Sequence, residues 1–433
     1  MCSSDLNGGI MAVPGSPEQA AQGIKDSPEL MMKDMLKAGG QLNHPEKVRF
    51  LCDHAVDTYH WAVEKVGCRF QSKRIKQEGG HSVPRSLFTE NGSGSAIVTK
   101  ELAYLEKKGL KPRTRCFAQT FLRDTDGRVK GVLVRDGYRF PKADSGKLKA
   151  IRARKGVVLA YGGFAADAKY RQIFDPKLTD KFDTTNQPGA TSESWREASR
   201  IGCQMIQSDW IQILPQTSPD EKGFGIGFAW SGHVSMFGLW VDAKTGKRFV
   251  NELANRKVRA DAILNVRNMG HDAIAIGDSG TAKSFEIIRP GMLKRELDRK
   301  CVFKCETLEE VAKRFGVPVE ELQKSVATVN DSVKTRKDVM GRPVNKDMQP
   351  LGTGPWYVAR MSPKIHHCMG GLLTNLDTQV IDVEGKPIPG LYAAGEATGG
   401  VHGQVRLGSC AVIDCLTNGR IAGQMAAKNA SWM

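Results

Sequence analysis

The chain has 433 residues and carries 63 Lys and Arg against 47 Asp and Glu, which gives a net charge of +16. Hydrophobic residues make up 40% and charged residues 25%, as in a folded protein, and the length indicates two or three domains rather than one small core. No run of 18 apolar residues occurs, which excludes a membrane-spanning helix.

The positive charge is the first feature that bears on partners. Lys and Arg recur along the whole chain without a block of five or six like charges, and neither zinc-finger spacing nor an aromatic-rich RNA-binding motif occurs. This pattern argues against nucleic-acid binding and favours the attraction of small anionic ligands. The ten cysteines include no CxxC pair, and no second pair or histidines accompany Cys301 and Cys305. We therefore expect buried thiols and no metal site.

In chain order, the glycine-rich loop NGGIMAVPGS (7–16) comes first, and we expect a chain that begins within a domain. A helix starts at Pro28 behind the N-cap Ser27, and a second is expected over 45–66. The segment GGHS (79–82) interrupts the helical pattern before a third helix begins at about residue 96.

The next segments alternate between strand and helix signals. Asp126-Gly127 predicts a β-hairpin, and KGVVLAYGGF (155–164) predicts a strand that ends in glycines. Helices are expected near 285–299 and over 307–336, the second behind a capping box at Thr307. The last eighty residues return to strand and glycine. We therefore predict one discontinuous α/β domain, formed by 1–204 and 351–433, with an inserted lid domain over 205–350.

The C-terminal stretch is the most informative. Leu391–Ala394 is a short apolar strand followed by Gly395-Glu396, and ligands of open α/β sheets bind at that end of a strand. The Glu396 carboxylate is placed to accept hydrogen bonds from a ribose. A helix from Ser409 would present free N–H groups to an anionic ligand. The alternative is a glycine-rich connection without a ligand, which the clustering of Glu396, His402 and Arg406 in one loop argues against.

The segment GLYAAGEATGGVHGQVRLGS (390–409) closely resembles the C-terminal FAD loop of the fumarate reductase/succinate dehydrogenase flavoprotein family. Further matches, in family order, are NGGIMAVPGS, GGHS, GVVLAYGGF, TTNQPGATSESW, GKRFVNELANR and IHHCMGG. The resemblance implies a discontinuous, three-layer, Rossmann-like FAD-binding domain (1–204 and 351–433) and an inserted α+β capping domain (205–350). It also implies FAD as the cofactor.

The same resemblance implies residue roles. Arg256 matches the arginine that delivers a proton to the substrate, and His366 and Arg406 match the pair that binds the substrate carboxylate. Arginine suits a carboxylate because its planar fork binds both oxygens, but as an acid it needs a relay that reprotonates it. Without the resemblance, Arg256 would be interpreted as a surface arginine on a helix, and His366 as a core histidine or a metal ligand. The residues that match FAD contacts are Gly9, Ala12, Ala160, Gly162, Gly163, Gly395, Glu396, Arg406, Ser409, Cys410 and Ala411.

The sequence departs from the family at its start. The family begins with a strand–GxGxxG–helix unit that holds the FAD pyrophosphate, and no such motif occurs here. We therefore expect an N-terminally truncated chain, with MCSSDL (1–6) as a junction remnant and a reduced affinity for FAD. On the flavin side, Ser192-Glu193-Ser194 replaces a Gly-Asp-Gly stretch, and Tyr161 stands where Thr is usual.

A further departure concerns the substrate. Leu214 stands where fumarate reductases have a lid histidine. The Thr, Glu and Arg of their second carboxylate site align with Ser231, Gly232 and Ser235. The resemblance therefore implies reduction of the C=C bond of an α,β-unsaturated monocarboxylate rather than of fumarate, with hydride from flavin N5 and a proton from Arg256. Trp210 and Trp230 are candidate walls for an apolar or aromatic substrate.

Two alternatives stay open. One is an enzyme similar to 3-ketosteroid dehydrogenases, although those rely on catalytic tyrosines. The other is a flavin-free, inactive fragment. The expected partners are a small anionic substrate and an external electron donor, a haem or FMN protein or domain, with the cytoplasm and the periplasm equally open as compartments.

Overall fold

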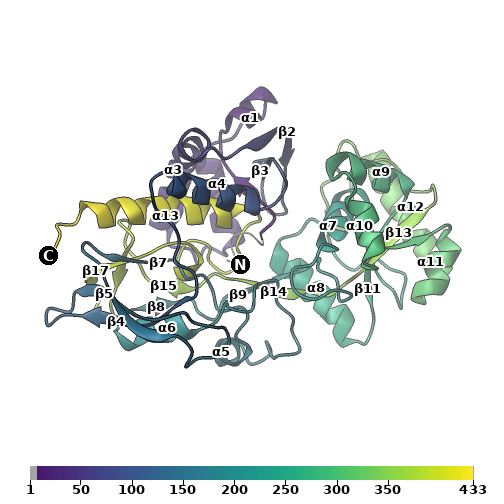
Figure 1. Cartoon of the computed structure of the whole chain (residues 1–433). Helices are drawn as coiled ribbons and strands as arrows, with labels where there is room; N and C mark the ends of the chain where they lie inside the picture. Colours follow the sequence, from purple (N-terminus) through teal and green to yellow (C-terminus); the bar gives the residue numbers. More distant parts are fainter. Residues whose placement is uncertain (1–6, 433) are drawn as a thin grey trace. The chain divides into compact units, whose positions relative to one another are not determined.

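The computed structural model describes residues 7–432, and the chain folds into two compact units (Figure 1). The first unit comprises the residues up to Phe182, Asn186–Gln212 and His367 onward, and the second comprises Asp183–Thr185 and Ile213–His366. The expected junction remnant, residues 1–6, lies outside the described residues.

The boundaries of the two units differ from the expected insertion at 205–350. The chain changes unit within strands β9 (Ile211–Leu214) and β14 (Lys364–Cys368). The first change comes after the expected residue 205, because β8 (Met205–Ile206) pairs with β15 (Gly371–Leu372) inside the first unit. The second comes late because β13 (Trp356–Met361) lies in the main sheet of the second unit. That the second unit caps a flavin stays a prediction.

The N-terminal part of the first unit is helical around a small sheet. Its antiparallel sheet has the order β1-β3-β2, with β1 at Ile10–Ala12, β2 at Phe70–Lys76 and β3 at Ser86–Thr89. The helices are α1 (Pro17–Ala21), α2 (Pro28–Ala38), α3 (Pro45–Trp61), its π-helical continuation η2 (Ala62–Val66) and α4 (Ser95–Glu106). The Ser27 side chain accepts the Leu30 N–H at 3.2 Å, so the expected start of α2 is confirmed.

A parallel strand pair forms the centre of the first unit. The strand β7 (Val157–Leu159) pairs with β17 (Pro387–Ala393), and β16 (Gln379–Ile381) lies on the other side of β17. Because β7 and β17 are parallel, the segments after Leu159 and Ala393 leave the sheet at the same edge. The long helix α13 (Cys410–Lys428) packs between α3 and these strands (Figure 1).

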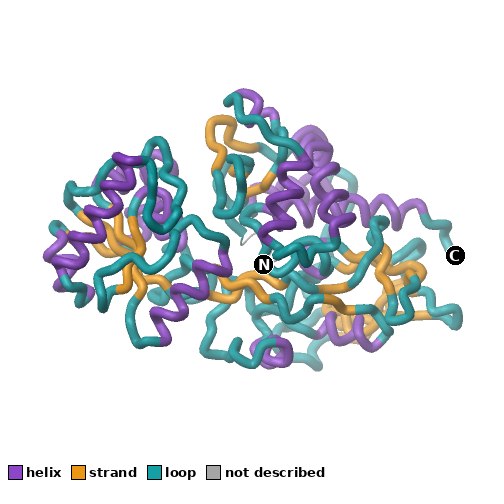
Figure 2. The backbone as a smooth tube through the Cα atoms, turned by 180° about the vertical axis from the view of Figure 1, so that it is seen from behind, coloured by secondary structure: helices purple, strands orange, loops and turns teal. Residues whose placement is uncertain are grey.

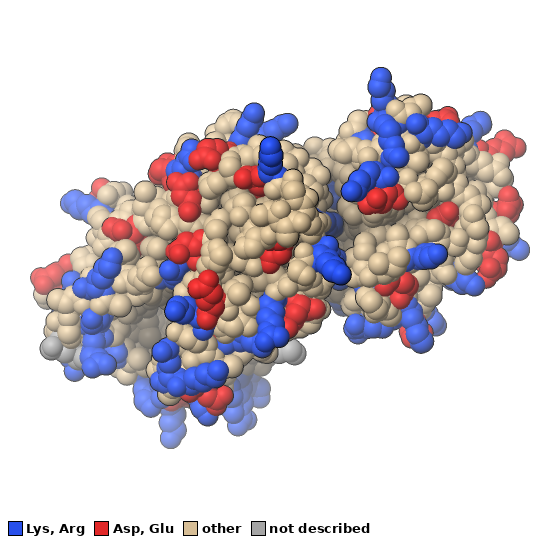
Figure 3. Space-filling model, turned by 90° about the horizontal axis from the view of Figure 1, so that it is seen from above, with Lys and Arg blue, Asp and Glu red and all other residues tan. Residues whose placement is uncertain are grey.

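The predicted hairpin at Asp126-Gly127 is confirmed as part of an antiparallel sheet with the order β4-β5-β6. Its strands are β4 (Cys116–Arg123), β5 (Val129–Asp136) and β6 (Lys147–Arg152), and the remaining helices of the unit are α5 (Ala168–Phe174) and α6 (Glu193–Arg200). Residues 107–155 hold 16 Lys and Arg against four Asp. The positive charge is therefore concentrated here rather than spread evenly, although Lys and Arg side chains also lie across the face shown in Figure 3.

The second unit is an antiparallel sheet covered by helices on both faces (Figure 2). The strand order is β10-β11-β13-β12, with β10 at Leu239–Asp242, β11 at Ala273–Gly277 and β12 at Phe303–Cys305. Alternate residues of β11 face opposite sides. Ile274 and Ile276 pack with α11 (Leu308–Phe315) and α12 (Val319–Thr335). Ala273 and Ala275 belong to the other core, with the helices α7 (Phe228–Phe237), α8 (Arg256–Asn268), α9 (Ser279–Ile288) and α10 (Met292–Asp298).

Two predicted helices are each broken into two. The expected helix at 285–299 is interrupted at Pro290-Gly291, between α9 and α10. The expected helix over 307–336 ends at Gly316, whose φ of 69° is left-handed, and restarts after Pro318. The predicted N-cap is confirmed, because Thr307 accepts the Glu310 N–H at 3.2 Å. Among the described residues, no helix is long and apolar enough to cross a membrane.

Candidate active site

The turn after β17 places Glu396 against the end of β7. Gly395 has a φ of 68°, and a Cβ there would lie 2.9 Å from the Cys415 Sγ atom, so the turn requires glycine. The Glu396 carboxylate accepts the Cys368 N–H at 2.9 Å. A Cβ at Gly163 would lie 2.3 Å from Glu396 Oε1. The fold therefore brings Gly163, Gly395 and Glu396 together, as the sequence predicted for one ligand.

The His367 ring faces the Glu396 carboxylate. Its Nδ1 lies 3.4 Å from a Glu396 oxygen, and burial lowers the pKa of His367 to about 4. Burial alone would raise the pKa of Glu396, but His367 and the Cys368 N–H outweigh it and lower that pKa. His367 is thus neutral at pH 7. With Nδ1 donating to the carboxylate, its Nε2 is an acceptor that is buried and has no hydrogen-bond partner among the described residues.

His402 repeats this arrangement with a second carboxylate. Its Nε2 lies 3.0 Å from Asp414 Oδ2, and both side chains are 4% exposed. The His402 Nδ1 is buried and has no partner within residues 7–432. The His367 and His402 rings meet edge to face at a centroid distance of 5.5 Å. Two buried histidines that each lack one partner indicate a polar group that residues 7–432 do not supply.

The glycine loop between Glu396 and α13 is fixed by α3. Lys47 Nζ donates to the Gly399 carbonyl at 3.0 Å and to Thr374 Oγ1 at 3.1 Å. Asn43 Nδ2 donates to the Val401 carbonyl at 2.9 Å. Burial lowers the pKa of Lys47 to about 8, against the opposing charge of Asp414. Lys47 could not be predicted as a contact of this loop, because nothing in the local sequence indicates that a helical lysine is buried.

The start of α13 meets the N-terminal loop. The Ala12 N–H donates to the Ser409 carbonyl at 3.1 Å, and the Ser86 and Ser409 hydroxyls lie 2.6 Å apart. Ser409 has a φ of 64°, which is uncommon for a residue other than glycine, and Cys410 is the first residue of α13. The predicted contacts Ala12, Ser409 and Cys410 therefore lie side by side, with Ala411 next on the helix.

The other predicted residues of the first unit are more separate. Gly9 has a φ of 59°, and a Cβ there would lie 2.3 Å from the Ser93 carbonyl carbon. Ala160 and Gly162 follow β7, and the Gly162 carbonyl accepts the Trp195 indole N–H at 3.1 Å. Arg406 is 4% exposed, its Nη1 donates to the Leu407 carbonyl at 3.0 Å, and its own carbonyl accepts Gln212 Nε2 at 2.8 Å.

Arg256 opens α8 in the second unit. Asn255 caps the helix by accepting the Val258 N–H at 3.0 Å, which makes Arg256 the first helical residue. A cation at a helix N-terminus opposes the helix dipole, so Arg256 does not serve helix stability there. The preceding segment is fixed by Arg248, which donates to Glu252 at 2.7 Å and to Asp338 at 2.8 Å.

His366 also belongs to the second unit. Its Nδ1 lies 2.7 Å from Thr185 Oγ1, and its ring is nearly parallel to that of Phe224. Thr185 comes from the TTNQPGATSESW motif, so two segments of the family pattern meet at this histidine. How Arg256 and His366 are placed toward Arg406 stays a prediction.

The lid positions that depart from the family pattern are buried. Ser231, Gly232 and Ser235 lie in α7 and are buried, and the Ser235 hydroxyl donates to the Gly232 carbonyl at 2.7 Å. Leu214 is buried as well. The expectation that Trp230 walls a substrate site is wrong, because its side chain is 0% exposed and packs in the core against Phe285. Trp210 is half-buried in the first unit.

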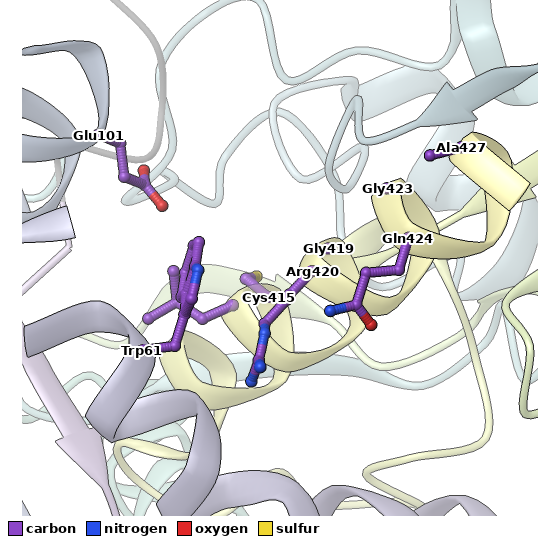
Figure 4. Close-up of a pocket in the computed structure, with 9 residues that line it drawn as sticks. Trp61, Glu101, Cys415, Gly419, Arg420, Gly423, Gln424 and Ala427 are labelled. Carbon is purple, nitrogen blue, oxygen red and sulfur yellow. The ribbon is translucent and has the colours of Figure 1, made fainter. Parts of the chain in front are cut away.

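A cavity of about 580 Å³ lies along α13 in the first unit (Figure 4). Glu101 from α4 faces the α13 side chains across it in the figure. Its lining is Trp61, Glu101, Cys415, Leu416, Gly419, Arg420, Gly423, Gln424 and Ala427. None of these residues was predicted from the sequence. Cys415 connects the cavity to the Gly395 turn. No group of three or more His, Cys, Asp or Glu residues that could hold a metal occurs in the part of the chain that the structure describes.

These features fit an FAD-binding oxidoreductase. At Gly162 a Cβ would meet no atom within 4 Å, which leaves room for a ligand close to the backbone. The buried ring nitrogens of His367 and His402 that lack a partner can bind polar groups of a ligand. The FAD binding domain family model matches residues 2–412.

Curated relatives and solved structures cover nearly the whole chain. The acrylate reductase flavoprotein subunit of Shewanella woodyi is 38% identical over 98% of this chain and 83% of its own. The urocanate reductase of Eggerthella lenta is 32% identical over 98% of this chain and 68% of its own. The open form of a flavocytochrome c3 fumarate reductase matches with a TM-score of 0.76 and 30% identity, over 98% of this chain and 72% of that one. The chain therefore belongs to the fumarate reductase/succinate dehydrogenase flavoprotein family, and FAD is its cofactor.

Proposed function

We propose that this protein is an FAD-dependent reductase of the C=C bond of α,β-unsaturated monocarboxylates. The observation that carries the proposal is Arg256, which begins α8 where a cation opposes the helix dipole. Bound FAD supplies hydride to one alkene carbon. The Arg256 guanidinium holds a proton for the other carbon, while His366, oriented by Thr185, and Arg406 hold the carboxylate.

The FAD contacts divide between two parts of the first unit. Glu396, with Gly163 beside it, would accept hydrogen bonds from the ribose. The N–H groups at the start of α13, at Cys410 and Ala411, would face the flavin, where a helix N-terminus stabilises negative charge. Gly9 and Ala12 would line the flavin, and Ala160 and Gly162 would pack on the adenosine half.

A monocarboxylate is favoured by the composition of α7. A second carboxylate needs a cation or several hydrogen-bond donors. Ser231, Gly232 and Ser235 offer two hydroxyls, of which the Ser235 hydroxyl already donates to its own helix. The name acrylate reductase of the 38% identical relative agrees with this substrate class.

The electron donor lies outside this chain, as a haem or FMN protein or domain. The comparison with cytochrome-type relatives supports this, since a relative from Shewanella frigidimarina named fumarate reductase (cytochrome) is 32% identical over 98% of this chain. A Rhodococcus jostii 3-ketosteroid dehydrogenase has a TM-score of 0.73 at 24% identity, which shows a shared fold alone. Arg256, His366 and Arg406 favour the enoate reductase.

The test is reduction by an artificial donor. The purified protein, saturated with FAD, should show flavin absorption and should oxidise reduced methyl viologen when acrylate or a substituted acrylate is added. Tight flavin binding without oxidation of the viologen by any enoate would overturn the proposed reaction. Absence of flavin binding would identify the chain as an inactive fragment.

A further inference from the structure

The second unit contains a glycine–aromatic loop that the proposed function does not use. Residues 223–228 read GFGIGF, so that Phe224, Ile226 and Phe228 alternate with glycines, and all three are half-buried. Gly223 and Gly225 have φ values of 66° and 63°, a region that a residue with a side chain rarely adopts. The glycines therefore set the path of a backbone that presents apolar side chains at every second position.

Polar contacts hold this loop in place. Buried Lys364 donates to the Gly223 carbonyl at 2.9 Å, and the Gly223 N–H donates to Asp183 at 3.0 Å. One Glu221 oxygen accepts the Ile226 and Gly227 N–H groups at 2.8 and 2.6 Å. The loop is thus fixed before any ligand binds, which reduces the entropy lost on binding.

The aromatic side chains of the loop lie beside His366. The Phe224 ring is 6.1 Å from the His366 ring between centroids, with 24° between their planes. The Phe228 ring is 4.5 Å from that of Phe224. The Arg289 guanidinium carbon lies 5.9 Å from the Phe228 centroid. A half-buried aromatic pair therefore continues from the residue that would bind the substrate carboxylate.

We propose that Phe224 and Phe228 bind the substituent on C3 of the substrate and select a 3-arylacrylate over acrylate and fumarate. The inference rests on the proposed function, because it takes His366 as a carboxylate ligand. A conjugated 3-arylacrylate is planar. When its carboxylate is bound at His366, its aromatic ring would lie along the plane of the Phe224 ring. Aromatic rings pack on one another at these separations.

The cations near this surface give a competing interpretation. Lys364 is 3% exposed on its side chain and is already paired with Asp183, and the Arg289 guanidinium lies beside Phe228. A preference for fumarate would therefore assign Arg289, rather than the phenylalanines, as the specificity residue and would overturn the proposal.

The experiment compares cinnamate, acrylate and fumarate with the FAD-loaded protein and reduced methyl viologen. Wild type should have its highest kcat/KM with cinnamate. Phe224→Leu should lower kcat/KM for cinnamate by about 3- to 10-fold, the value of an aromatic pair, and that for acrylate by less than about 2-fold. Phe224→Trp should retain the preference. The matched control is Phe303→Leu, because Phe303 is a half-buried phenylalanine of β12 that packs on Phe315. This variant should leave the ratio of kcat/KM for cinnamate to kcat/KM for acrylate unchanged.

Each result decides one of the two proposals. Equal losses with all three enoates in Phe224→Leu, or a wild-type preference for acrylate, would overturn the aromatic assignment and leave the reductase intact. No oxidation with any enoate would overturn the reductase itself. If Phe224→Leu does not fold, calorimetry with wild type replaces it. Binding of 3-phenylpropanoate at least about 10-fold tighter than propanoate supports the assignment, and equal affinities overturn it.

Discussion

The Glu396 carboxylate occupies the space beside the Gly163 Cα where any other residue would place its Cβ, 2.3 Å from Oε1. The two residues follow the parallel strands β17 and β7, which leave the sheet at the same edge. This contact makes the position of the carboxylate dependent on the absence of a side chain at Gly163.

Gly163→Ala should therefore weaken FAD binding. The new methyl group would displace the carboxylate or the Cys368 thiol, which would lie 3.0 Å from it. Loss of a charge-assisted hydrogen bond costs about 1.5–3 kcal/mol, so the Kd for FAD should rise by roughly 10-fold or more. Fluorescence titration with FAD measures this. Gly352→Ala, where a Cβ would meet no atom within 4 Å, should leave the Kd unchanged, and equal Kd values for both variants would contradict the prediction.

His367 should make the stability of the protein depend on pH. Its pKa is about 4 in the folded chain and about 6.5 when unfolded, so between these values the unfolded chain binds the additional proton. Stability is then fully present above pH 6.5 and falls as the pH drops toward 4. From pH 7 to 5 the loss from this residue should be about 2 kcal/mol.

Urea denaturation at pH 7 and pH 5 measures this difference for the apoprotein. His367→Gln should change the stability difference between pH 7 and pH 5 by about 2 kcal/mol relative to wild type, in the direction of a smaller loss at pH 5. His60→Gln, at a histidine whose side chain is 46% exposed, should retain the wild-type dependence. If the two variants lose equal stability between the two pH values, His367 is not the group that titrates.

The glycine loop and Glu396 could be predicted because they form one contiguous motif after an apolar strand. The partners of that motif could not. Asp414 lies on α13, twelve residues beyond His402, and Lys47 reaches Gly399 from a helix in the N-terminal part of the chain. Such contacts depend on the tertiary fold, and no local pattern distinguishes Lys47 from exposed helical lysines such as Lys33 and Lys37 of α2.

Other differences had a local cause that the helical periodicity concealed. Gly316 and Pro318 break the helix expected over 307–336, although the apolar spacing continues through them. The unit boundaries differ from the expected ones because β8 pairs with β15 in the first unit, whereas β13 pairs with β11 in the second. The sequence does not indicate that Trp230 is a core residue, because nothing local shows that Phe285 covers its face of α7.

Arg256→Ala should abolish enoate reduction and leave reduction of the bound flavin by reduced methyl viologen intact. Removal of a general acid lowers the rate by about 10²- to 10⁴-fold. Arg256 is not among the residues proposed to bind FAD, so flavin reduction should not change. Stopped-flow spectroscopy separates the two half-reactions. Lys257→Ala is the matched control, since Lys257 is the next residue of α8 and its ammonium pairs with Asp261 at 2.6 Å. Turnover of any enoate at the wild-type rate in Arg256→Ala would show that another group delivers the proton.

Arg406→Lys should raise KM with a smaller effect on kcat. Arginine can bind both oxygens of a carboxylate through its planar fork, whereas a lysine ammonium makes a single-point contact. A lost charge-assisted hydrogen bond predicts a KM increase of about 10-fold or more. Steady-state kinetics with the best enoate checks this, with Arg420→Lys on α13 as the control, since Arg420 pairs with Asp57 at 2.6 Å. An unchanged KM in Arg406→Lys would remove Arg406 from the carboxylate site and leave His366 as its sole ligand in the proposal.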